Sequence, residues 1–222
     1  EKLFAVSPPL AQLMNDKLQL RGIPTVIGNV IDTHLFTPST SKENKYTFIT
    51  IAHLRPVKEI SKILHAFSLT QKKAKSIALI IIGDGPQRKV LQELTKTLNL
   101  SNVTFTGELP RHGVAAQLRR ANCYINWSRY ETFSVATHEA ISCGLRIIST
   151  PCEGPEDSIR YCNEFICDSN TPKSLSEKML QLLNAPINLR ISPQQKHEFI
   201  KHNFGKNAIS TQLITEYESI VQ

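Results

Sequence analysis

The sequence has no apolar run long enough to cross a lipid bilayer, which takes roughly 20 residues. Its longest run, Ile77–Ile82, is much shorter and ends at Gly83, so we expect a buried strand there. Glu1 is not followed by the charged start, apolar stretch and small-residue cleavage site of a secretory signal. These absences predict a cytoplasmic protein, and they leave open peripheral contact with the inner face of a membrane.

Cysteines are few, and their number, five, is odd. A chain of 222 residues can fold without disulfide bonds, so we expect these cysteines to be reduced, as they are in the cytosol. Cys162 and Cys167 lack the second matching pair that a zinc site requires. We therefore predict small buried hydrophobic side chains at these positions and no metal site.

Acidic residues are outnumbered, because 26 Lys and Arg face 19 Asp and Glu and give a formal net charge of +7. Such an excess attracts nucleotide phosphates, acidic lipid headgroups and nucleic acid. Nucleic acid is disfavoured, because the basic residues are not interleaved with aromatic ones and no known DNA- or RNA-binding motif is present. We expect no nucleic-acid partner.

Short apolar stretches alternate along the chain with longer segments that carry apolar residues at helical spacing. Parallel strands need crossovers, and helical crossovers cover both faces of a sheet. The alternation therefore predicts an α/β fold, a doubly wound and Rossmann-like parallel sheet. The expected strands are 46–53, 78–82, 103–105, 123–127, 146–149 and 165–167. The expected helices are 59–71, 86–98, 113–120, 134–143 and 173–183.

The two ends of the chain differ from this alternating core, which we place at residues 41–190. Residues 1–40 contain a strand end, a helix and most of a linker at Thr37–Ser41. We interpret them as the end of a preceding domain and the connection to it. Residues 191–222 contain two helical stretches that would pack back toward that domain.

Ligands bind at the carboxyl ends of strands in open parallel sheets, so the loops after the strands carry the candidate sites. Glu131 precedes a helix that starts at Ser134, a good N-cap, and ends at Gly144, a good C-cap. The free N–H groups of residues 132–135 and the helix dipole would bind a phosphate, with Glu131 beside a sugar attached to it. Glu139 has apolar neighbours, so its carboxylate needs a partner such as a ribose diol. The alternative makes Glu131 a solvated loop acid and Glu139 a surface residue of an amphipathic helix.

The segment 130–144, Tyr-Glu-Thr-Phe-Ser-Val-Ala-Thr-His-Glu-Ala-Ile-Ser-Cys-Gly, closely resembles the signature of glycosyltransferase family 4. Members of this family are retaining enzymes of the two-domain GT-B architecture, and they use no metal in this fold. The resemblance implies that the chain is the C-terminal, donor-binding half. It also implies that Glu131 approaches the donor sugar, that Glu139 holds the nucleotide ribose and that the intervening backbone cradles the diphosphate. The cradle residues are Thr132, Phe133, Ser134 and Val135.

A second loop, residues 52–59, carries cations at the end of the first core strand. A lysine there can neutralise a diphosphate leaving group, so Lys58 joins Glu131 as a candidate catalytic residue. Lys58 matches the family pattern, whereas His53 stands where an arginine is usual. His53 or Arg55 would substitute for that arginine in binding the donor. The alternative for His53 is a partly buried imidazole at a strand end.

Three further loops resemble the family. Gly83 lies in a tight strand-to-helix turn, where glycine permits positive φ and close backbone approach. Phe105 and Thr106 resemble the segment whose main chain meets the nucleobase in relatives. Gly154 lies in a segment that resembles the turn closing the donor pocket.

Together these residues predict the donor-binding part of a glycosyltransferase. Its expected reaction moves a sugar, with retention, from a nucleoside-diphosphate sugar to a glycan or lipid-linked acceptor, with no cofactor beyond the donor. The acceptor pocket would belong to the preceding domain, so we expect these 222 residues alone to transfer no sugar. Two alternatives stay open: a GT-B half that has decayed into a binding or scaffold module, and a sugar-nucleotide epimerase of the same architecture.

Overall fold

The computed structural model describes residues 2–40, 45–184 and 191–221. Its largest part is an α/β unit in which strands and helices alternate. The strands are β3 (Tyr46–Ile51), β4 (Ile77–Ile82), β5 (Val103–Gly107), β6 (Cys123–Asn126), β7 (Arg146–Ser149) and β8 (Phe165–Ile166). The helices are α2 (Ile60–Lys73), α3 (Arg88–Thr97), α4 (Arg111–Arg120), α5 (Val135–Ser142), α6 (Glu156–Tyr161) and α7 (Pro172–Asn184), with a 3₁₀ turn, η1 (Pro56–Lys58), before α2.

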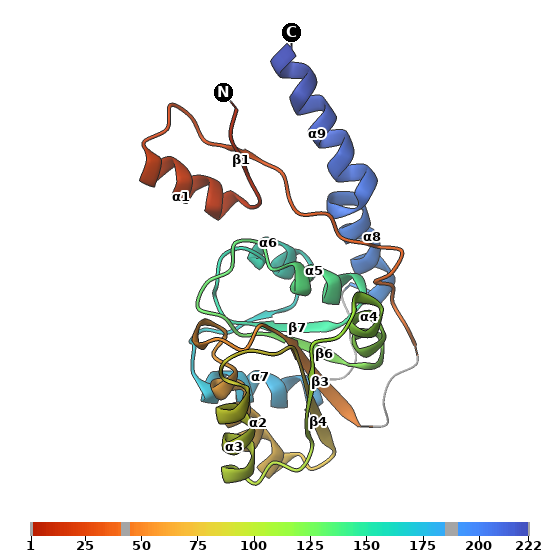
Figure 1. Cartoon of the computed structure of the whole chain (residues 1–222). Helices are drawn as coiled ribbons and strands as arrows, with labels where there is room; N and C mark the ends of the chain where they lie inside the picture. Colours follow the sequence, from red (N-terminus) through yellow and green to blue (C-terminus); the bar gives the residue numbers. More distant parts are fainter. Residues whose placement is uncertain (1, 41–44, 185–190, 222) are drawn as a thin grey trace.

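The six strands form one parallel sheet in the order β5-β4-β3-β6-β7-β8. The chain therefore runs from β3 to one edge, returns to β6 beside β3, and runs to the other edge (Figure 1). This order is the doubly wound arrangement, and it makes β3 and β6 the point where the chain reverses direction across the sheet. The predicted α/β fold class is confirmed.

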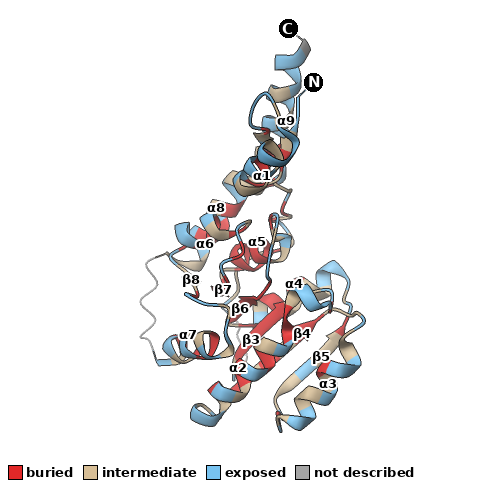
Figure 2. Cartoon of the chain, turned by 90° about the vertical axis from the view of Figure 1, so that its left-hand side faces the viewer, coloured by how far each residue is buried: buried red, intermediate tan, exposed pale blue. Residues whose placement is uncertain are grey.

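Helices cover both faces of the sheet. Figure 2 shows buried residues along its strands. Phe48 packs with residues of α2, α3 and α7 on one face. Its neighbour Ile49 packs with residues of α4, α5 and α6 on the other. Because successive side chains of a strand point to opposite faces, a strand covered on both sides needs apolar residues throughout. This is why β4 reads as one continuous apolar run.

Several elements differ from their expected bounds, three of the helices among them. Helix α3 begins at Arg88, two residues after Pro86, because the N–H of Gln87 donates to the carbonyl of Leu54 outside the helix. Helix α4 begins at Arg111, directly after Pro110. Helix α6 was not predicted, because it is too short to show a clear helical period.

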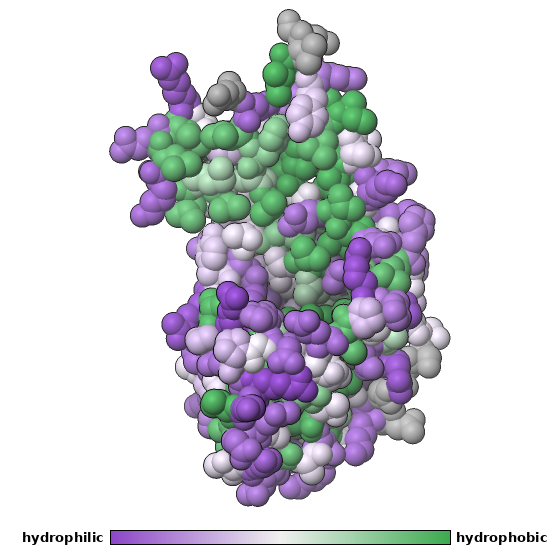
Figure 3. Space-filling view, viewed as in Figure 1, coloured by the Kyte–Doolittle hydropathy of each residue, from purple (hydrophilic) through white to green (hydrophobic). Residues whose placement is uncertain are grey.

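The chain ends form a second part of the molecule. Helix α9 (Lys206–Val221) continues from α8 (Pro193–Phe204). Near the end of α9 lie the N-terminal elements β1 (Phe4–Ala5), α1 (Pro8–Leu18) and β2 (Thr25–Val26) (Figure 1). Figure 3 shows apolar side chains gathered over this upper region. Exposed residues there include Leu13, Leu18, Ile23, Val26, Ile214 and Ile220.

The predicted domain boundaries at 40/41 and 190/191 touch segments 41–44 and 185–190. Both segments, and Ser41 of the expected linker, lie outside the described residues. The division into three parts therefore stays a prediction. The chain crosses between the two parts at Ile31, whose N–H donates to the carbonyl of Phe204 at 2.8 Å.

A buried ion cluster fastens α8 to the sheet. The Glu164 carboxylate accepts from Lys196 Nζ at 2.5 Å, from Arg146 Nε at 2.9 Å and from the N–H of Ile147 at 3.1 Å. Lys196 Nζ also donates to the carbonyl of Leu145 at 2.9 Å. The side chains of Lys196 and Glu164 are 1% and 2% exposed and that of Arg146 is 24% exposed, and each charge is paired, which is the condition under which a buried ion pair is tolerated.

Replacing Lys196 with methionine should lower the free energy of unfolding by about 3 kcal/mol, because it leaves part of the buried Glu164 charge uncompensated. The matched control is Lys201→Met on the same helix, whose partner Glu198 is 3.7 Å away and exposed. That control should change stability by less than about 0.5 kcal/mol. Urea unfolding followed by circular dichroism measures both. Equal losses in the two variants would contradict the assigned role of the cluster.

Candidate active site

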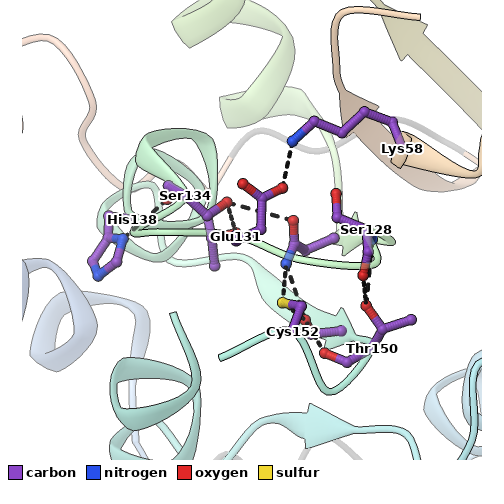
Figure 4. Close-up of polar contacts among 10 residues, drawn as sticks. Lys58, Ser128, Glu131, Ser134, His138, Thr150 and Cys152 are labelled. Atoms are coloured by element: carbon purple, nitrogen blue, oxygen red, sulfur yellow. Dashed lines mark hydrogen bonds and ion pairs between the residues drawn. The ribbon is translucent and has the colours of Figure 1, made fainter. Parts of the chain in front are cut away.

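The loops after β3 and β6 meet at the point where the chain reverses direction. Lys58 ends η1 in the first loop, and Glu131 lies in the second. The Lys58 Nζ donates to Glu131 Oε1 at 2.5 Å, although the two residues are 73 positions apart in the sequence (Figure 4). Crevices at this point of an open parallel sheet are where ligands bind. The two candidate catalytic residues are therefore brought together at the carboxyl end of the sheet.

Two cavities open beside this ion pair, and Lys58 lines both. The first, of about 130 Å³, lies between the ends of β3 and β6, and polar groups from both strands face it. These polar lining residues are Thr50, Tyr124, Asn126 and Ser128, joined by Ser134 of the loop. The second, of about 400 Å³, extends over the ends of β3, β4 and β5. It includes the predicted residues His53 and Gly83, and also Asp84, Glu108, Leu109 and Val114.

The main chain of Glu131 is held by the loop after β7. Its N–H donates to the carbonyl of Cys152 at 3.0 Å, and its carbonyl accepts from the N–H of Gly154 at 3.0 Å. A Cβ at Gly154 would lie 2.5 Å from the carbonyl carbon of Thr132. The absence of a side chain at Gly154 therefore permits the close approach that fixes Glu131, as the sequence predicts for this turn.

Ser134 occupies the N-cap position of α5, but the prediction that its side chain caps the helix is wrong. Its backbone is left-handed, with φ 62° and ψ 74°, and its hydroxyl makes no capping bond. It lies 2.7 Å from the hydroxyl of Thr137 and 3.4 Å from Asn126 Oδ1 (Figure 4). The left-handed backbone turns the side chain away from the first N–H groups of the helix.

The N–H groups of residues 132–135 consequently stay open. In the part of the chain that the structure describes, none of them has a hydrogen-bond acceptor. Successive N–H groups around a left-handed residue form a concave anion site, and the N-terminus of α5 adds its partial positive charge. The predicted cradle is thus a main-chain feature. The side chain of Phe133 is buried in the core, and those of Thr132 and Val135 are exposed.

The buried side chain of His138 stabilises the loop of residues 132–135 from the core side, a role that the sequence did not predict. Its Nδ1 lies 3.0 Å from the carbonyl of Ser134 and its Nε2 lies 3.0 Å from the hydroxyl of Ser158. A carbonyl only accepts, so we assign the proton to Nδ1. The ring stacks on Phe133 with centroids 4.0 Å apart. Burial lowers the pKa of His138 to about 4, so the ring is neutral near pH 7.

Glu139 is 9% exposed, so the alternative that makes it a surface residue is wrong. Burial raises its pKa to about 7, the guanidinium of Arg111 lowers it, and Asp32 raises it. Arg111 Nη2 lies 3.7 Å from Glu139 Oε1. Both glutamates also act on Tyr124. Burial raises the pKa of Tyr124, and the charges of Glu131 and Glu139 raise it further. The two carboxylates therefore act on the same buried phenol.

Some predicted residues lie elsewhere. Arg55 is exposed and lines neither cavity. Phe105 packs against the core, and the hydroxyl of Thr106 donates to the carbonyl of Gly107 at 2.8 Å. Neither faces the second cavity, which Glu108 lines instead. Strand β5 continues to Gly107, two residues beyond its expected end, and the role of Phe105 and Thr106 beside a nucleobase stays a prediction.

His53 is exposed and lines the second cavity, so its expected alternative as a partly buried imidazole is wrong. Gly83 has φ +122°, and a Cβ there would lie 2.0 Å from the carbonyl oxygen of Ala52. Only glycine fits this turn. Asp84 accepts from the N–H of Gly85 at 2.7 Å and from Arg88 at 2.5 Å, which is the arrangement of a tight turn.

Comparison with known proteins places this site in a family. Residues 32–203 match the family described as glycosyl transferases group 1. The chain belongs to this family. The resemblance to glycosyltransferase family 4, and with it the Rossmann-like fold of GT-B enzymes, is therefore confirmed.

Two curated proteins are among the relatives of this chain. It is 26% identical over 184 residues to N-acetyl-alpha-D-glucosaminyl L-malate synthase of Bacillus anthracis, a match that covers 81% of this chain and 47% of that protein. It is 24% identical over 204 residues to 2-deoxystreptamine N-acetyl-D-glucosaminyltransferase of Niallia circulans, a match that covers 86% of this chain and 52% of that protein. The chain thus spans about half of the length of either relative.

The chain also shares its fold with a protein of known structure. Anabaena HepE in complex with UDP has a TM-score of 0.88 at 16% identity, over 98% of this chain and 64% of that chain. HepE in complex with UDP-glucose has a TM-score of 0.84 at 18% identity, over the same shares of the two chains.

Three further features concern the described residues alone. They contain no group of three or more His, Cys, Asp or Glu side chains placed to hold a metal ion. Their helices include none that is both long and apolar enough to cross a membrane. All five cysteines are free and buried.

Replacing Gly154 with alanine should displace the Glu131 loop, because the new Cβ would overlap the main chain of Thr132. We expect a loss of about 2 kcal/mol in the free energy of unfolding, as for other overpacked sites. The amide resonances of residues 131–135 should shift in NMR spectra. The control is Gly22→Ala, where a Cβ meets nothing within 4 Å. Unchanged resonances in the Gly154 variant would show that Gly154 does not fix the loop.

Proposed function

We propose that this chain is the donor-binding part of a glycosyltransferase and that its donor is a nucleoside-diphosphate sugar. The observation that carries the proposal is the Lys58–Glu131 ion pair beside the open N–H groups of residues 132–135. One cation, one carboxylate and a main-chain anion site within one crevice match the chemistry of such a donor. Binding of UDP and UDP-glucose by HepE, a protein of the same fold, supports it.

On this proposal, donor binding separates the Lys58–Glu131 ion pair and gives each side chain a new partner. The diphosphate accepts from the N–H groups of residues 132–135 and takes Lys58 from Glu131. Glu131 then accepts from a hydroxyl of the donor sugar. Each charged side chain loses one partner and gains another, so neither is left buried and unpaired. As the sugar leaves, charge builds on the diphosphate, and Lys58 and the main-chain N–H groups are already in place to offset it.

The rest of the donor follows from the same placement. Glu139 accepts hydrogen bonds from the ribose hydroxyls, since a largely buried carboxylate beside the anion site needs such donors. The nucleobase occupies the second cavity, against Leu109 and Val114. His53 lines that cavity and takes the place of the arginine that is usual in the family. The positive charge comes from the protein itself, so we propose that transfer needs no metal and no cofactor.

We further propose hexosyl transfer with retention, in which the leaving diphosphate accepts the acceptor's proton on the same face of the sugar. The acceptor, a glycan or a lipid-linked molecule, would be bound by a preceding domain that covers the exposed apolar residues around α1 and α9. The 222 residues alone would then transfer no sugar. We place the protein in the cytoplasm, with contact to the inner face of a membrane where the acceptor is lipid-linked.

A decayed scaffold is the second candidate, because His53 replaces the family's usual arginine. A scaffold needs no donor site, so it predicts no nucleotide binding. A sugar-nucleotide epimerase would bind the same donor but release an altered free sugar. Product analysis by NMR on a longer form of the protein separates the epimerase from a transferase and shows whether the anomeric configuration is retained.

Calorimetric titration of the chain with UDP, ADP, GDP and UDP-N-acetylglucosamine tests donor binding. We expect Lys58→Gln to weaken binding of the bound nucleotide at least about tenfold, because it removes a charge-assisted contact to the diphosphate. Glu139→Ala should weaken it through loss of the ribose contact. The control is Lys89→Gln, which removes an exposed charge from α3 and should leave the affinity unchanged.

Absence of binding for every nucleotide would favour the scaffold. Binding that is equally strong in the Lys58, Glu139 and Lys89 variants would show that the nucleotide lies outside the assigned site.

A further inference from the structure

Arg111, the first residue of α4, approaches Glu139 from one side only. Its Nη2 lies 3.7 Å from Glu139 Oε1, and its guanidinium lies over the ring of Phe36 at 5.6 Å from the centroid. Phe36 is completely buried, so it offers a fixed face to the guanidinium. Arg111 thus lies between Phe36 and the Glu139 carboxylate, with its side chain 63% exposed.

The contact leaves the acceptor capacity of Glu139 largely free. A distance of 3.7 Å is within ion-pair range but beyond a hydrogen bond. A carboxylate offers about four lone-pair sites, which is more than two ribose hydroxyls require. Arg111 can therefore stabilise the negative charge of Glu139 without a hydrogen bond to its oxygens.

Asp32 acts on the same carboxylate with the opposite sign. It lies in the segment that leads into the α/β unit, where its Oδ1 accepts from the N–H of Leu35 at 3.1 Å. The hydroxyl of Ser142 on α5 donates to the carbonyl of Phe36 at 2.6 Å and fixes this segment against the helix of Glu139. Asp32 raises the pKa of Glu139 from this segment.

Two charged groups from different elements therefore act on the pKa of Glu139: Arg111 from α4 and Asp32 from the entering segment. Tyr124 stays neutral because burial raises its pKa. Arg111 and Asp32 are then the two charges that compete. Burial, Arg111 and Asp32 together leave Glu139 with a pKa of about 7.

We propose that Arg111 is a positioning residue that keeps Glu139 ionised as the acceptor for the donor ribose, with Asp32 opposing it, so that donor affinity depends on pH near neutrality. This inference rests on the proposed function, in which Glu139 binds the ribose. Arg111 itself need not touch the donor.

The direction of the pH dependence follows from the charge that binding requires. The ionised carboxylate accepts from both hydroxyls of a diol, whereas the protonated form loses part of that capacity. Donor affinity should therefore be full above the pKa of Glu139 and fall as the pH drops through it. Removing Arg111 raises that pKa and moves the fall to higher pH. Removing the charge of Asp32 lowers it and moves the fall to lower pH.

The first measurement uses the ligand-free chain. Carbon-13 NMR of the Glu139 carboxyl group gives its titration midpoint in wild type, Arg111→Gln, Arg111→Lys and Asp32→Asn. We expect the midpoint to rise by about one pH unit in Arg111→Gln, as for the loss of an opposite charge nearby. It should stay close to wild type in Arg111→Lys and fall in Asp32→Asn, which keeps the acceptor for Leu35. Lys89→Gln is the control for loss of a remote charge.

The second measurement is calorimetric titration with UDP-N-acetylglucosamine over the range from about pH 5.5 to about pH 8.5. Its diphosphate is esterified at both ends and has no proton to lose in this range, so the protein supplies the pH dependence. At pH 7, Arg111→Gln should bind about fivefold more weakly than wild type, because a rise of about one pH unit lowers the ionised fraction by that factor. At high pH the two affinities should converge.

The outcomes of these measurements distinguish failure of the role of Arg111 from failure of the proposed function. Donor binding with the same midpoint in all variants would overturn the role of Arg111 while the proposed function stands. Tighter binding by Arg111→Gln at every pH would show that Arg111 competes with the ribose, which also overturns it. Loss of binding that high pH does not restore would assign Arg111 to donor contact instead. No binding by wild type at any pH would contradict the proposed function, and the inference with it.

Discussion

The adjacency of β3 and β6 is the constraint on which the site depends. These two strands pair in parallel, so the loops that follow them end at the same edge of the sheet. This pairing brings together the loops of Lys58 and Glu131, whose side-chain atoms Nζ and Oε1 lie 2.5 Å apart although no local sequence links them. A sheet with another strand order would separate the two charges, and neither loop would then form a site for a substrate that carries both phosphate and sugar.

Much of the site's precision comes from hydrogen bonds among buried polar side chains at the end of β6. Asn126 donates to the hydroxyl of Ser149 at 3.0 Å and to the thiol of Cys152 at 3.2 Å, while its carbonyl lies near the hydroxyl of Ser134. This network joins β6, β7 and the start of α5 beneath Glu131 (Figure 4). Buried polar groups with satisfied partners rigidify their surroundings. The left-handed backbone at Ser134 persists because several such contacts fix it.

The sequence predicted what depends on local pattern. Apolar runs such as β4 and the loops between strands and helices were evident, and they were enough to predict the fold class and the positions of Lys58, Glu131 and Gly83. Ser134 does occupy the N-cap position, but the predicted side-chain cap is wrong, because capping preference is a statistical tendency that tertiary contacts override here. Strand β5 runs two residues beyond its expected end, since the end of a strand is not marked in its residues. Arg111 was missed as a site residue: its partner Glu139 is on another helix, and no spacing rule connects them.

The crossing between the two parts of the molecule carries an electrostatic consequence. The outgoing and returning segments touch at Ile31 and Phe204, and Ile31 also forms a β-bridge with Gly205. Asp32 is the next residue after Ile31, so the chain places this carboxylate directly at the junction of the two parts. Because Asp32 raises the pKa of Glu139, the residues that join the two parts also act on the electrostatics of the candidate site.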